Sequence, residues 1–259
     1  MKNAKRKEKL PMAKPKARVL IFDIETSPNL SYTWGKWQQD VIRFQSEWEM
    51  LSFSYKWLGE RKVIAVGRDK FSEEVLVRRL RQLFDEADVI IAHNGNSFDI
   101  KMCNAKFIEF NLDPPSPFKS IDTKLVAKRY FRFNSNKLDD LGNILGLGRK
   151  IQTGGFDLWL GCMSGDKASW KKMLAYNKQD VILLEKIYLK MRPWIANHPS
   201  MNIYEDKPDS CPKCAGGPLH KRGTVHTTKV GTVQRYQCQS CGGWSQARLG
   251  KRSNVTYVN

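Results

Sequence analysis

The sequence predicts an α/β domain, in which helices flank a mixed β-sheet, followed by a small β module that binds a metal ion. Three observations lead to this fold class. Residues 19–22 form an uninterrupted apolar run, which is typical of a buried strand. Between residues 50 and 191, strand-like runs alternate with stretches whose apolar residues recur at helical spacing. Near the C-terminus, two C-x-x-C pairs stand in a segment with little material for a core of its own.

The elements of the larger domain follow in order from local patterns. Residues 18–26 read as the first strand, and residues 50–59 and 62–67 as two strands paired in a hairpin. A helix is predicted behind Ser72, an N-cap residue, because apolar residues then recur at helical spacing. Residues 88–94 read as a fourth strand. Further helices are expected over residues 100–110, from Thr123, from Leu138 and over residues 169–191.

Changes in composition divide the chain into four parts. Residues 1–17 are a basic arm, which we expect to be disordered, and residues 18–192 are the α/β domain. Residues 193–208 contain three prolines and no period, so they read as a linker. Residues 209–259 are the cysteine module. A polymerase domain is not expected, because 259 residues leave no room for one beside these parts.

The net charge of +18 is concentrated at the two ends of the chain. Residues 1–18 and residues 209–259 each carry a net charge of +7, which leaves +4 for the middle. Basic segments attract polyanions by releasing counterions, so the expected partner is nucleic acid, with an anionic membrane surface as the weaker alternative. The sequence has neither an apolar run of about 18 residues nor a secretion signal. We therefore expect a cytoplasmic protein that does not bind membranes.

The first strand ends in two carboxylates, Asp23 and Glu25, with one isoleucine between them. Side chains two apart on a strand share a face, so both point the same way at the carboxyl end, where ligand sites of α/β sheets are found. In an apolar setting they raise each other's pKa, and a divalent cation with oxygen ligands would relieve the repulsion. A solvated strand end is the simpler alternative.

Two later stretches carry further polar residues of interest. In "AHNGNSFD" a strand-end turn is followed by Asp99 at a helix start, where a carboxylate is favourable even without a metal. In "YNKQD", Tyr176 and Asp180 lie one turn apart on the same face of a helix. Each pattern by itself is weak, because many helices carry such residues.

Taken in order, Asp-x-Glu, Asp and Tyr-x-x-x-Asp resemble the three motifs of the DEDD superfamily of 3′→5′ exonucleases, which have the ribonuclease H-like fold. The tyrosine four residues before Asp180 indicates the tyrosine subclass, DEDDy, because the histidine subclass would have histidine at position 175, which is alanine. The segment from Leu138 to Tyr188 further resembles stand-alone bacterial and phage exonucleases of the polymerase-B-like type. The resemblance covers roughly residues 18–192 and implies a location in a bacterial nucleoid or a phage-infected cell.

The resemblance implies hydrolysis of phosphodiester bonds with two divalent ions, Mg²⁺ or Mn²⁺. Asp23 would bridge both ions. Glu25 and Asp180 would complete the site on the side of the attacking water, and Asp99 would serve the second ion. Tyr176 would position the water rather than act as a base, because the pKa of a phenol is about 10.

Substrate contacts are assigned to the turn that precedes Asp99. Asn94 is expected to hold the terminal nucleotide by a hydrogen bond and Phe98 by stacking, although Phe98 also fits a core position. His93 is assigned to the same substrate site, although a histidine here is more often a structural hydrogen-bonding group. Asp122 either supports the site or caps the helix that follows it.

Two segments outside the motifs have features of substrate contacts. Residues 32–50 hold several aromatic rings among polar residues, which would stack on unpaired bases or pack against the sheet. Residues 150–166 are rich in glycine and precede the last helix, as expected of a mobile substrate loop.

The cysteine module has two C-x-x-C pairs, Cys211 with Cys214 and Cys238 with Cys241, separated by 23 residues. Four thiolates in two such knuckles suit one structural, tetrahedral Zn²⁺, and redox-active pairs are the alternative. Residues 223–238 alternate as a hairpin does, and the module resembles the zinc ribbons of nucleic-acid enzymes and transposases.

Basic residues of this module, among them Arg222, Lys229 and Arg235, are expected to bind nucleic acid. Docking to a replication protein is the alternative. The leading hypothesis is thus a metal-dependent exonuclease, acting on DNA rather than RNA, in replication or repair, with a polymerase supplied in trans. A structure-selective endonuclease and a non-catalytic nucleic-acid-binding protein are the other candidates, but the presence of the whole acidic set argues against the last.

Overall fold

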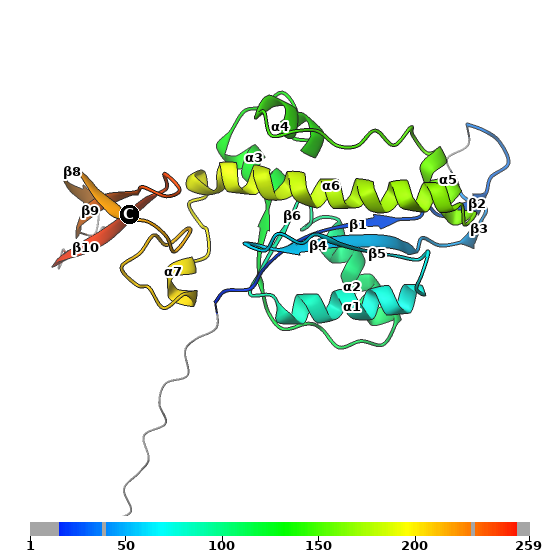
Figure 1. Cartoon of the computed structure of the whole chain (residues 1–259), viewed down its shortest axis with the longest axis horizontal. Coiled ribbons are helices and arrows are strands. Elements are labelled where there is room, and N and C mark those ends of the chain that lie inside the picture. The colour runs from blue at the N-terminus through cyan, green and yellow to red at the C-terminus, as the bar shows by residue number, and fades with distance from the viewer. Residues whose placement is uncertain (1–15, 38–39, 229–230, 253–259) are drawn as a thin grey trace, which may run out of the picture. The chain divides into compact units, whose positions relative to one another are not determined.

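The computed structural model describes residues 16–37, 40–228 and 231–252 of the chain (Figure 1). Its internal contacts group Arg18–His198 into one unit, and the residues from Pro199 onward belong to a second, smaller unit. The expected basic arm lies, except for its last two residues, outside the described residues. Among the described residues, no helix is both long and apolar enough to cross a membrane.

A five-stranded mixed sheet forms the centre of the larger unit. Its strands, in spatial order, are β5 (Ile64–Gly67), β4 (Met50–Trp57), β1 (Val19–Thr26), β6 (Val89–Ala92) and β7 (Lys119–Asp122). β1 pairs with β4 antiparallel and with β6 parallel, and β7 continues in the parallel direction. The first half of β1 is fully buried, as its continuous apolar run predicts. The predicted mixed α/β architecture is confirmed.

Helices α1 (Glu73–Glu86) and α2 (Asp99–Glu109) cover one face of this sheet (Figure 1). The side chain of Ser72 caps α1 by accepting a hydrogen bond from the backbone N–H of Val75, as predicted. Phe84 of α1 is the centre of an aromatic cluster, with ring centroids 5.0 Å from Phe22 and 5.7 Å from Phe107 in edge-to-face contacts. This packing fixes α2, and therefore its first residue, against the sheet.

The long helix α6 (Lys167–Met191) lies along the other face, together with α3 (Thr123–Tyr130), α4 (Leu138–Ile144) and α5 (Asp157–Met163) (Figure 1). The strand β4 presents Ser52 and Ser54 to the protein interior, and both are fully buried. Because these side chains are small, the helix can approach the sheet closely. Asn177 of α6 thereby reaches Asp23 near the carboxyl end of β1.

Several elements differ from the sequence-based expectation. α6 begins at Lys167 rather than near residue 169, because the side chain of Asp166 caps it by accepting from the N–H of Ser169 at 2.7 Å. The glycine-rich segment before it contains the short helix α5, and the aromatic segment contains a two-stranded ribbon, β2 (Leu30–Tyr32) with β3 (Arg43–Ser46). Both ribbon strands are exposed, so they lack the apolar alternation by which strands are recognised.

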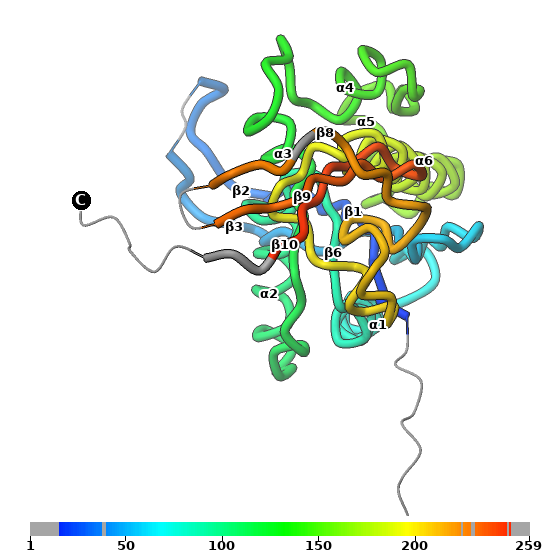
Figure 2. Tube along the Cα trace, turned by 90° about the vertical axis from the view of Figure 1, so that its left-hand side faces the viewer, coloured from blue at the N-terminus to red at the C-terminus, as the bar shows by residue number. Residues whose placement is uncertain are grey.

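The smaller unit contains a three-stranded antiparallel sheet, whose strands run side by side in Figure 2. The hairpin predicted here is present, and a third strand completes the sheet. A short helix, α7, lies in the proline-containing segment, and Met201 within it donates its N–H to the carbonyl oxygen of Pro212 at 2.7 Å. The bounds are α7 (Met201–Tyr204), β8 (Leu219–Thr228), β9 (Gly231–Cys238) and β10 (Trp244–Arg252), and the 3-10 helix Arg192–Trp194 ends the larger unit's helical part.

Candidate active site

Three carboxylates from two distant parts of the chain converge at the carboxyl end of β1. Asp23 and Glu25 come from that strand, and Asp180 comes from the middle of α6. One oxygen of each lies within 4.8 Å of the others. The separation is small enough for a single cation to contact all three, as expected from the side chains that share a face of the strand.

Asp99 lies at the margin of this cluster. It is the first residue of α2, reached by a turn from β6, the parallel neighbour of β1. Its Oδ1 accepts a hydrogen bond of 3.4 Å from the backbone N–H of Ile24, the residue between Asp23 and Glu25. The carboxyl ends of neighbouring parallel strands thus bring a fourth carboxylate beside the other three, although its oxygens lie outside the closest group.

Burial raises the pKa values of all these acids, and repulsion from neighbouring acids adds to it. The pKa of Asp23 lies well above its usual range because of burial and the neighbouring Asp99. Burial, followed by the charge of Asp180, raises the pKa of Glu25 to about 8. Burial also raises the pKa of Asp99, to about 6, and that of Asp180. Four acids that resist ionisation in this way form a strong site for positive charge.

The burial of the Asp180 carboxylate also favours a bound cation. Its side chain is only 1% exposed, and its Oδ1 is buried without a hydrogen-bond partner among the described residues. A buried carboxylate oxygen without a partner is costly, on the order of 1–3 kcal/mol or more. The donor set, which consists of carboxylate oxygens, is the one that Mg²⁺ and Mn²⁺ prefer. The residues present therefore fit a divalent cation.

Lys150 contributes a positive charge that the sequence analysis missed. Its Nζ lies 2.6 Å from Oδ2 of Asp180 and donates a second hydrogen bond to the hydroxyl of Tyr176 at 2.7 Å. Burial alone would lower the pKa of Lys150, but Asp180 and Tyr176 hold it above its usual range. Lys150 opens the glycine-rich segment, where its backbone N–H donates to Oδ1 of Asp139 at 2.8 Å.

Asn177 is the second functional residue that the sequence analysis missed. It is fully buried on α6, and its Nδ2 donates to Oδ2 of Asp23 at 2.7 Å. Its own Oδ1 accepts a hydrogen bond of 3.3 Å from the hydroxyl of Ser52 on β4. Asn177 therefore fixes the orientation of the Asp23 carboxylate. The sequence alone could have indicated this residue, because an asparagine three residues before Asp180 lies on the same face of the helix.

Tyr176 is nearly buried, and its phenol stays protonated. Burial, Asp180 and Glu25 all raise the pKa of Tyr176 far above its usual range. Since the Lys150 ammonium already donates to the phenol oxygen, the phenol's own proton is left for an acceptor such as the Asp180 carboxylate, whose pKa this hydrogen bond helps to lower. This arrangement suits a group that positions an oxygen and does not suit a base.

The sequence of the larger unit matches the profile of the RNase H superfamily over residues 20–192, about two thirds of the chain. The chain belongs to the RNase H superfamily. Over 67 residues it is 31% identical to a PolC-type DNA polymerase III of Ureaplasma parvum serovar 3, a match that covers 26% of this chain and 4% of that protein. Its fold resembles that of the family B DNA polymerase from the hyperthermophilic archaeon Pyrobaculum calidifontis, with a TM-score of 0.53 and 16% identity over 70% of this chain and 25% of that one. This superfamily member thus spans only a small part of either polymerase.

Asp122, the last residue of β7, holds the turn before Asp99. Asn94 has a left-handed backbone (φ 70°), which asparagine tolerates better than most residues. Oδ1 and Oδ2 of Asp122 accept from the N–H groups of Asn94 at 3.0 Å and Asn96 at 3.2 Å. Asp122 also caps α3, as one of the two sequence-based alternatives predicts. Lys124 donates to Oδ1 of Asn94 at 3.2 Å, so that amide oxygen already has a partner.

Phe98 and His93 have different environments within this turn. The ring of Phe98 is 43% exposed, so the core alternative for it is wrong and the ring is available for stacking. Both ring nitrogens of His93 have partners, because Nε2 lies 2.9 Å from the carbonyl oxygen of Asn136 and Nδ1 lies 2.9 Å from Oγ1 of Thr123. Burial lowers the pKa of His93 to about 4. His93 therefore stays neutral and is held within the protein, as the structural alternative expects.

In the smaller unit, the four sulfur atoms of the two C-x-x-C pairs form one cluster, with all of them within 4.8 Å of one another. The Sγ atoms of Cys211 and Cys241 lie 3.7 Å apart, and those of Cys214 and Cys238 lie 3.8 Å apart. A disulfide has its sulfurs about 2.05 Å apart, whereas a tetrahedron with Zn–S bonds of about 2.3 Å has edges of about 3.8 Å. The group therefore fits a zinc ion and excludes disulfides between these cysteines in this arrangement.

Arg222 and Arg235 occupy directly opposed positions on β8 and β9, and Gln246 of β10 continues the row. Both arginines are exposed, and neither forms an ion pair with a described residue. Like charges opposite each other weaken a sheet, so this pair does not stabilise the fold by itself. Lys229, the third basic residue assigned to this surface, lies outside the described residues.

Proposed function

We propose that the chain is a metal-dependent 3′→5′ exonuclease that hydrolyses phosphodiester bonds of DNA. The observation that carries the proposal is the meeting of Asp23, Glu25 and Asp180 around an unpartnered carboxylate oxygen, with Asp99 and Tyr176 beside them. Membership of the RNase H superfamily is consistent with it. The order of the motifs supports the DEDDy type, which acts from a 3′ end.

The carboxylates would hold two divalent cations, Mg²⁺ or Mn²⁺. Asp23, Glu25 and Asp180 form the closest group, and Asp99 would contribute from the adjoining helix start. When bound, the cations would neutralise charge on the scissile phosphate and make water more acidic. Their binding would also displace the protons that the raised pKa values retain on these acids.

The other residues of the site hold and orient the reacting groups. Asn177 restrains the Asp23 carboxylate, and the N–H of Ile24 restrains that of Asp99. The Tyr176 hydroxyl, oriented by Lys150, would donate its proton in a hydrogen bond to the attacking water. Such positioning by a group that is itself fixed lowers the entropic part of the barrier.

The turn before Asp99 would receive the 3′-terminal nucleotide. Phe98 is exposed beside the acids and would stack on the terminal base. The Oδ1 of Asn94 already accepts from Lys124, so Asn94 would contact the nucleotide through its side-chain NH2 group. His93 would act indirectly, by fixing the turn. Stacking of a terminal base on Phe98 would favour an exonuclease over an endonuclease.

The smaller unit would bind the same nucleic acid. We propose that Cys211, Cys214, Cys238 and Cys241 hold a structural zinc ion and that residues 209–259 act as a zinc ribbon, separate from the nuclease domain of residues 18–192. The exposed row with Arg222 and Arg235 would contact phosphates. Docking to a replication protein or a polymerase in trans is the competing use of this surface.

A 3′-end assay tests the proposed function. Single-stranded DNA labelled at its 5′ end should be shortened from the 3′ end with Mg²⁺ or Mn²⁺ and remain intact in EDTA. Asp23→Ala should abolish hydrolysis while DNA binding is retained, and RNA of the same sequence should be cut more slowly. Internal cleavage of circular single-stranded DNA would identify the endonuclease alternative. A wild-type protein inert toward all three substrates with both metals would contradict the proposal.

A further inference from the structure

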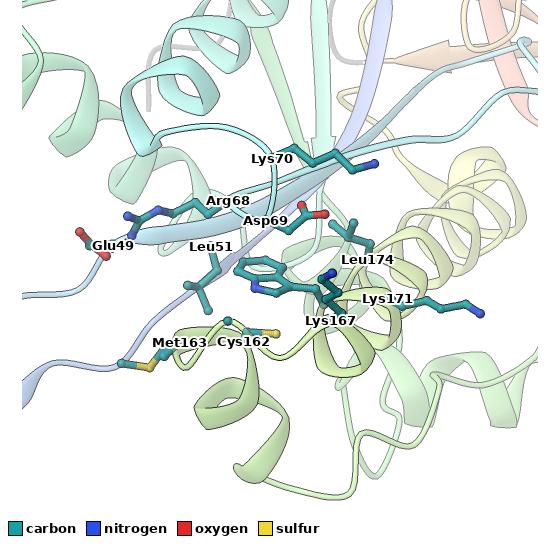
Figure 3. A pocket seen from close by; sticks show the side chains of 12 residues that line it. Glu49, Leu51, Arg68, Asp69, Lys70, Cys162, Met163, Lys167, Lys171 and Leu174 are labelled. Carbon is teal, nitrogen blue, oxygen red and sulfur yellow. Dashed lines mark hydrogen bonds and ion pairs between the residues drawn. The ribbon is translucent and has the colours of Figure 1, made fainter.

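A cleft of about 810 Å³ lies beside the candidate active site in the larger unit (Figure 3). One wall comes from the start of β4 and the loop after β5, and the other from the end of α5 and the first two turns of α6. Neither the carboxylates nor the turn before Asp99 line it. The proposed hydrolysis therefore leaves the cleft unexplained.

The rim of this cleft is positively charged. Arg68, Lys70, Lys167 and Lys171 line it, and only Arg68 forms an ion pair there, with Glu49. The three lysines are exposed and form no ion pair with a described residue. Figure 3 shows Lys70 and Lys171 reaching outward from different elements. Asp69 is the remaining acid, so the lysines outnumber it.

Two of these lysines lie in the first turns of α6, where positive charge destabilises a helix. Lys167 is the first residue of α6, next to the positive end of the helix dipole, and Lys171 follows one turn later on the same side. A pair of like charges at this spacing weakens a helix by about 0.2–0.5 kcal/mol. An anion bound between them would reverse both effects. The two lysines are also about 6 Å apart along the axis, which suits successive phosphates of an extended strand.

The floor of the cleft is apolar. Leu51, Cys162 and Trp170 are buried, and Leu174 lies beside them. Gly67 lets β5 approach this floor, because a Cβ atom at that position would lie 2.9 Å from a methyl group of Leu174. An apolar floor below a cationic rim matches the flat bases and charged phosphates of a nucleotide chain.

The cleft is close to the carboxylates. Leu51 precedes Ser52, whose partner across the strands is Glu25. Leu51, Cys162 and Trp170 of the floor also pack in one apolar cluster with Tyr176, which adjoins the acids. A strand held at the acids would need to travel only a short way to enter the cleft.

We propose that this cleft binds the nucleic-acid strand a few nucleotides away from the bond that is cut, with phosphates on Lys167 and Lys171 and bases over the apolar floor. The proposal rests on the proposed function for the chemistry of its ligand. A strand fits better than an acidic protein segment, because the cleft adjoins the site proposed to cut phosphodiesters. It also fits better than a free nucleotide, because the cations extend over more than one phosphate.

Binding without hydrolysis tests the proposal. The full chain would be titrated without added Mg²⁺ or Mn²⁺ against a fluorescent single-stranded DNA 20-mer at several salt concentrations. The proteins compared are the wild type, Lys167→Gln/Lys171→Gln, and the control Lys128→Gln/Lys190→Gln. The control removes two exposed lysines from helix ends outside the cleft. We expect the cleft variant to bind about tenfold more weakly at 0.1 M salt. The slope of log Kd against log salt should fall by about 1.4, the value for two lost phosphate contacts on a single strand.

Each result bears on the proposal separately from the proposed function. Equal affinity and slope in the cleft variant and the control would overturn the assignment of the cleft. Thymidine 5′-monophosphate that competes as well as the 20-mer, and loses affinity in the same variant, would assign the cleft to a free nucleotide and overturn the strand. A protein that binds DNA through these lysines but never hydrolyses it would contradict the proposed function and leave the cleft assigned.

Discussion

The ammonium of Lys150 lies 2.6 Å from the Asp180 carboxylate, and both side chains also adjoin Tyr176. A lysine from the loop before α5 thus pairs with an acid of α6 that lies 30 residues later in the sequence. Its charge offsets part of the repulsion among the carboxylates, since it acts to lower the pKa values of Asp23 and Glu25 as well.

Replacing Lys150 by glutamine should lower kcat by about 100-fold, because the Tyr176 hydroxyl loses the donor that orients it and the acids lose a compensating charge. Steady-state hydrolysis of a labelled oligonucleotide measures this. Lys172→Gln is the control, since Lys172 lies in the same region but donates to the carbonyl oxygen of Thr153 and not to a site acid or to Tyr176. Equal kcat values for the two variants would show that Lys150 has no part in the reaction.

Asn177→Ala should weaken Mn²⁺ binding by about 10–100-fold, the effect typical of removing a group that orients a metal ligand. Asp23 would keep its charge but lose the hydrogen bond that holds its carboxylate. Isothermal titration with Mn²⁺ gives the affinity directly, without substrate. Lys178→Ala, the next residue of α6 and an exposed one, controls for changes to the helix. Unchanged Mn²⁺ affinity in Asn177→Ala would be incompatible with this role.

The stability of the metal-free protein should fall as the pH rises. Burial and the charge of Asp180 raise the pKa of Glu25 from 4.5 to about 8, so the folded protein retains a proton that the unfolded chain releases. This stabilisation is complete below pH 4.5 and is lost as the pH passes through 8. The pKa of Asp99, raised to about 6 chiefly by burial, acts in the same direction.

Melting temperatures without added Mg²⁺ or Mn²⁺ at pH 5.5 and pH 8.5 measure this effect. We expect a fall of roughly 5 °C, which corresponds to about 2 kcal/mol for a chain of this size. Glu25→Gln should reduce the fall, because glutamine does not titrate, and Mg²⁺ at pH 8.5 should restore the wild type. A melting temperature that is constant or rises over this interval would contradict the assignment of these pKa values.

The smaller unit should contain one zinc ion per chain. Elemental analysis of protein purified without chelator should find it, and Cys238→Ser should lose it, because a structural site needs all four thiolates. His220→Ala is the control, since it removes another potential zinc ligand from β8 without touching the cysteines. Retention of zinc by Cys238→Ser, or its loss from His220→Ala, would show that the ligand set is different.

The parts of the site that were predictable from the sequence have local signatures. Asp23 and Glu25 are two apart on a strand, and Tyr176 and Asp180 are four apart on a helix, so their shared faces follow from backbone period alone. The buried run of β1 likewise needs no distant information. Their meeting in space was inferred from the family resemblance, and in the structure Asp23, Glu25 and Asp180 lie together.

The parts that escaped prediction depend on contacts between distant segments. Nothing near Lys150 in the sequence indicates that it will pair with Asp180, because the pairing arises only when the loop folds over α6. Asn177 was overlooked because its partner, Asp23, is 154 residues away. The strand β7 has only four residues, two of them exposed, and therefore has too weak a pattern to be recognised.

Asp122, the last residue of that short strand, ties the outermost edge of the sheet to the site. Its carboxylate accepts from two N–H groups of the turn before Asp99 and from two at the start of α3, so the turn and the helix move as one piece. The position of Asp99 relative to Asp23 is therefore set by where β7 docks. Substitutions that displace β7 would change the spacing between the acids without altering any of them. The edge of the sheet therefore controls the geometry of the reaction centre.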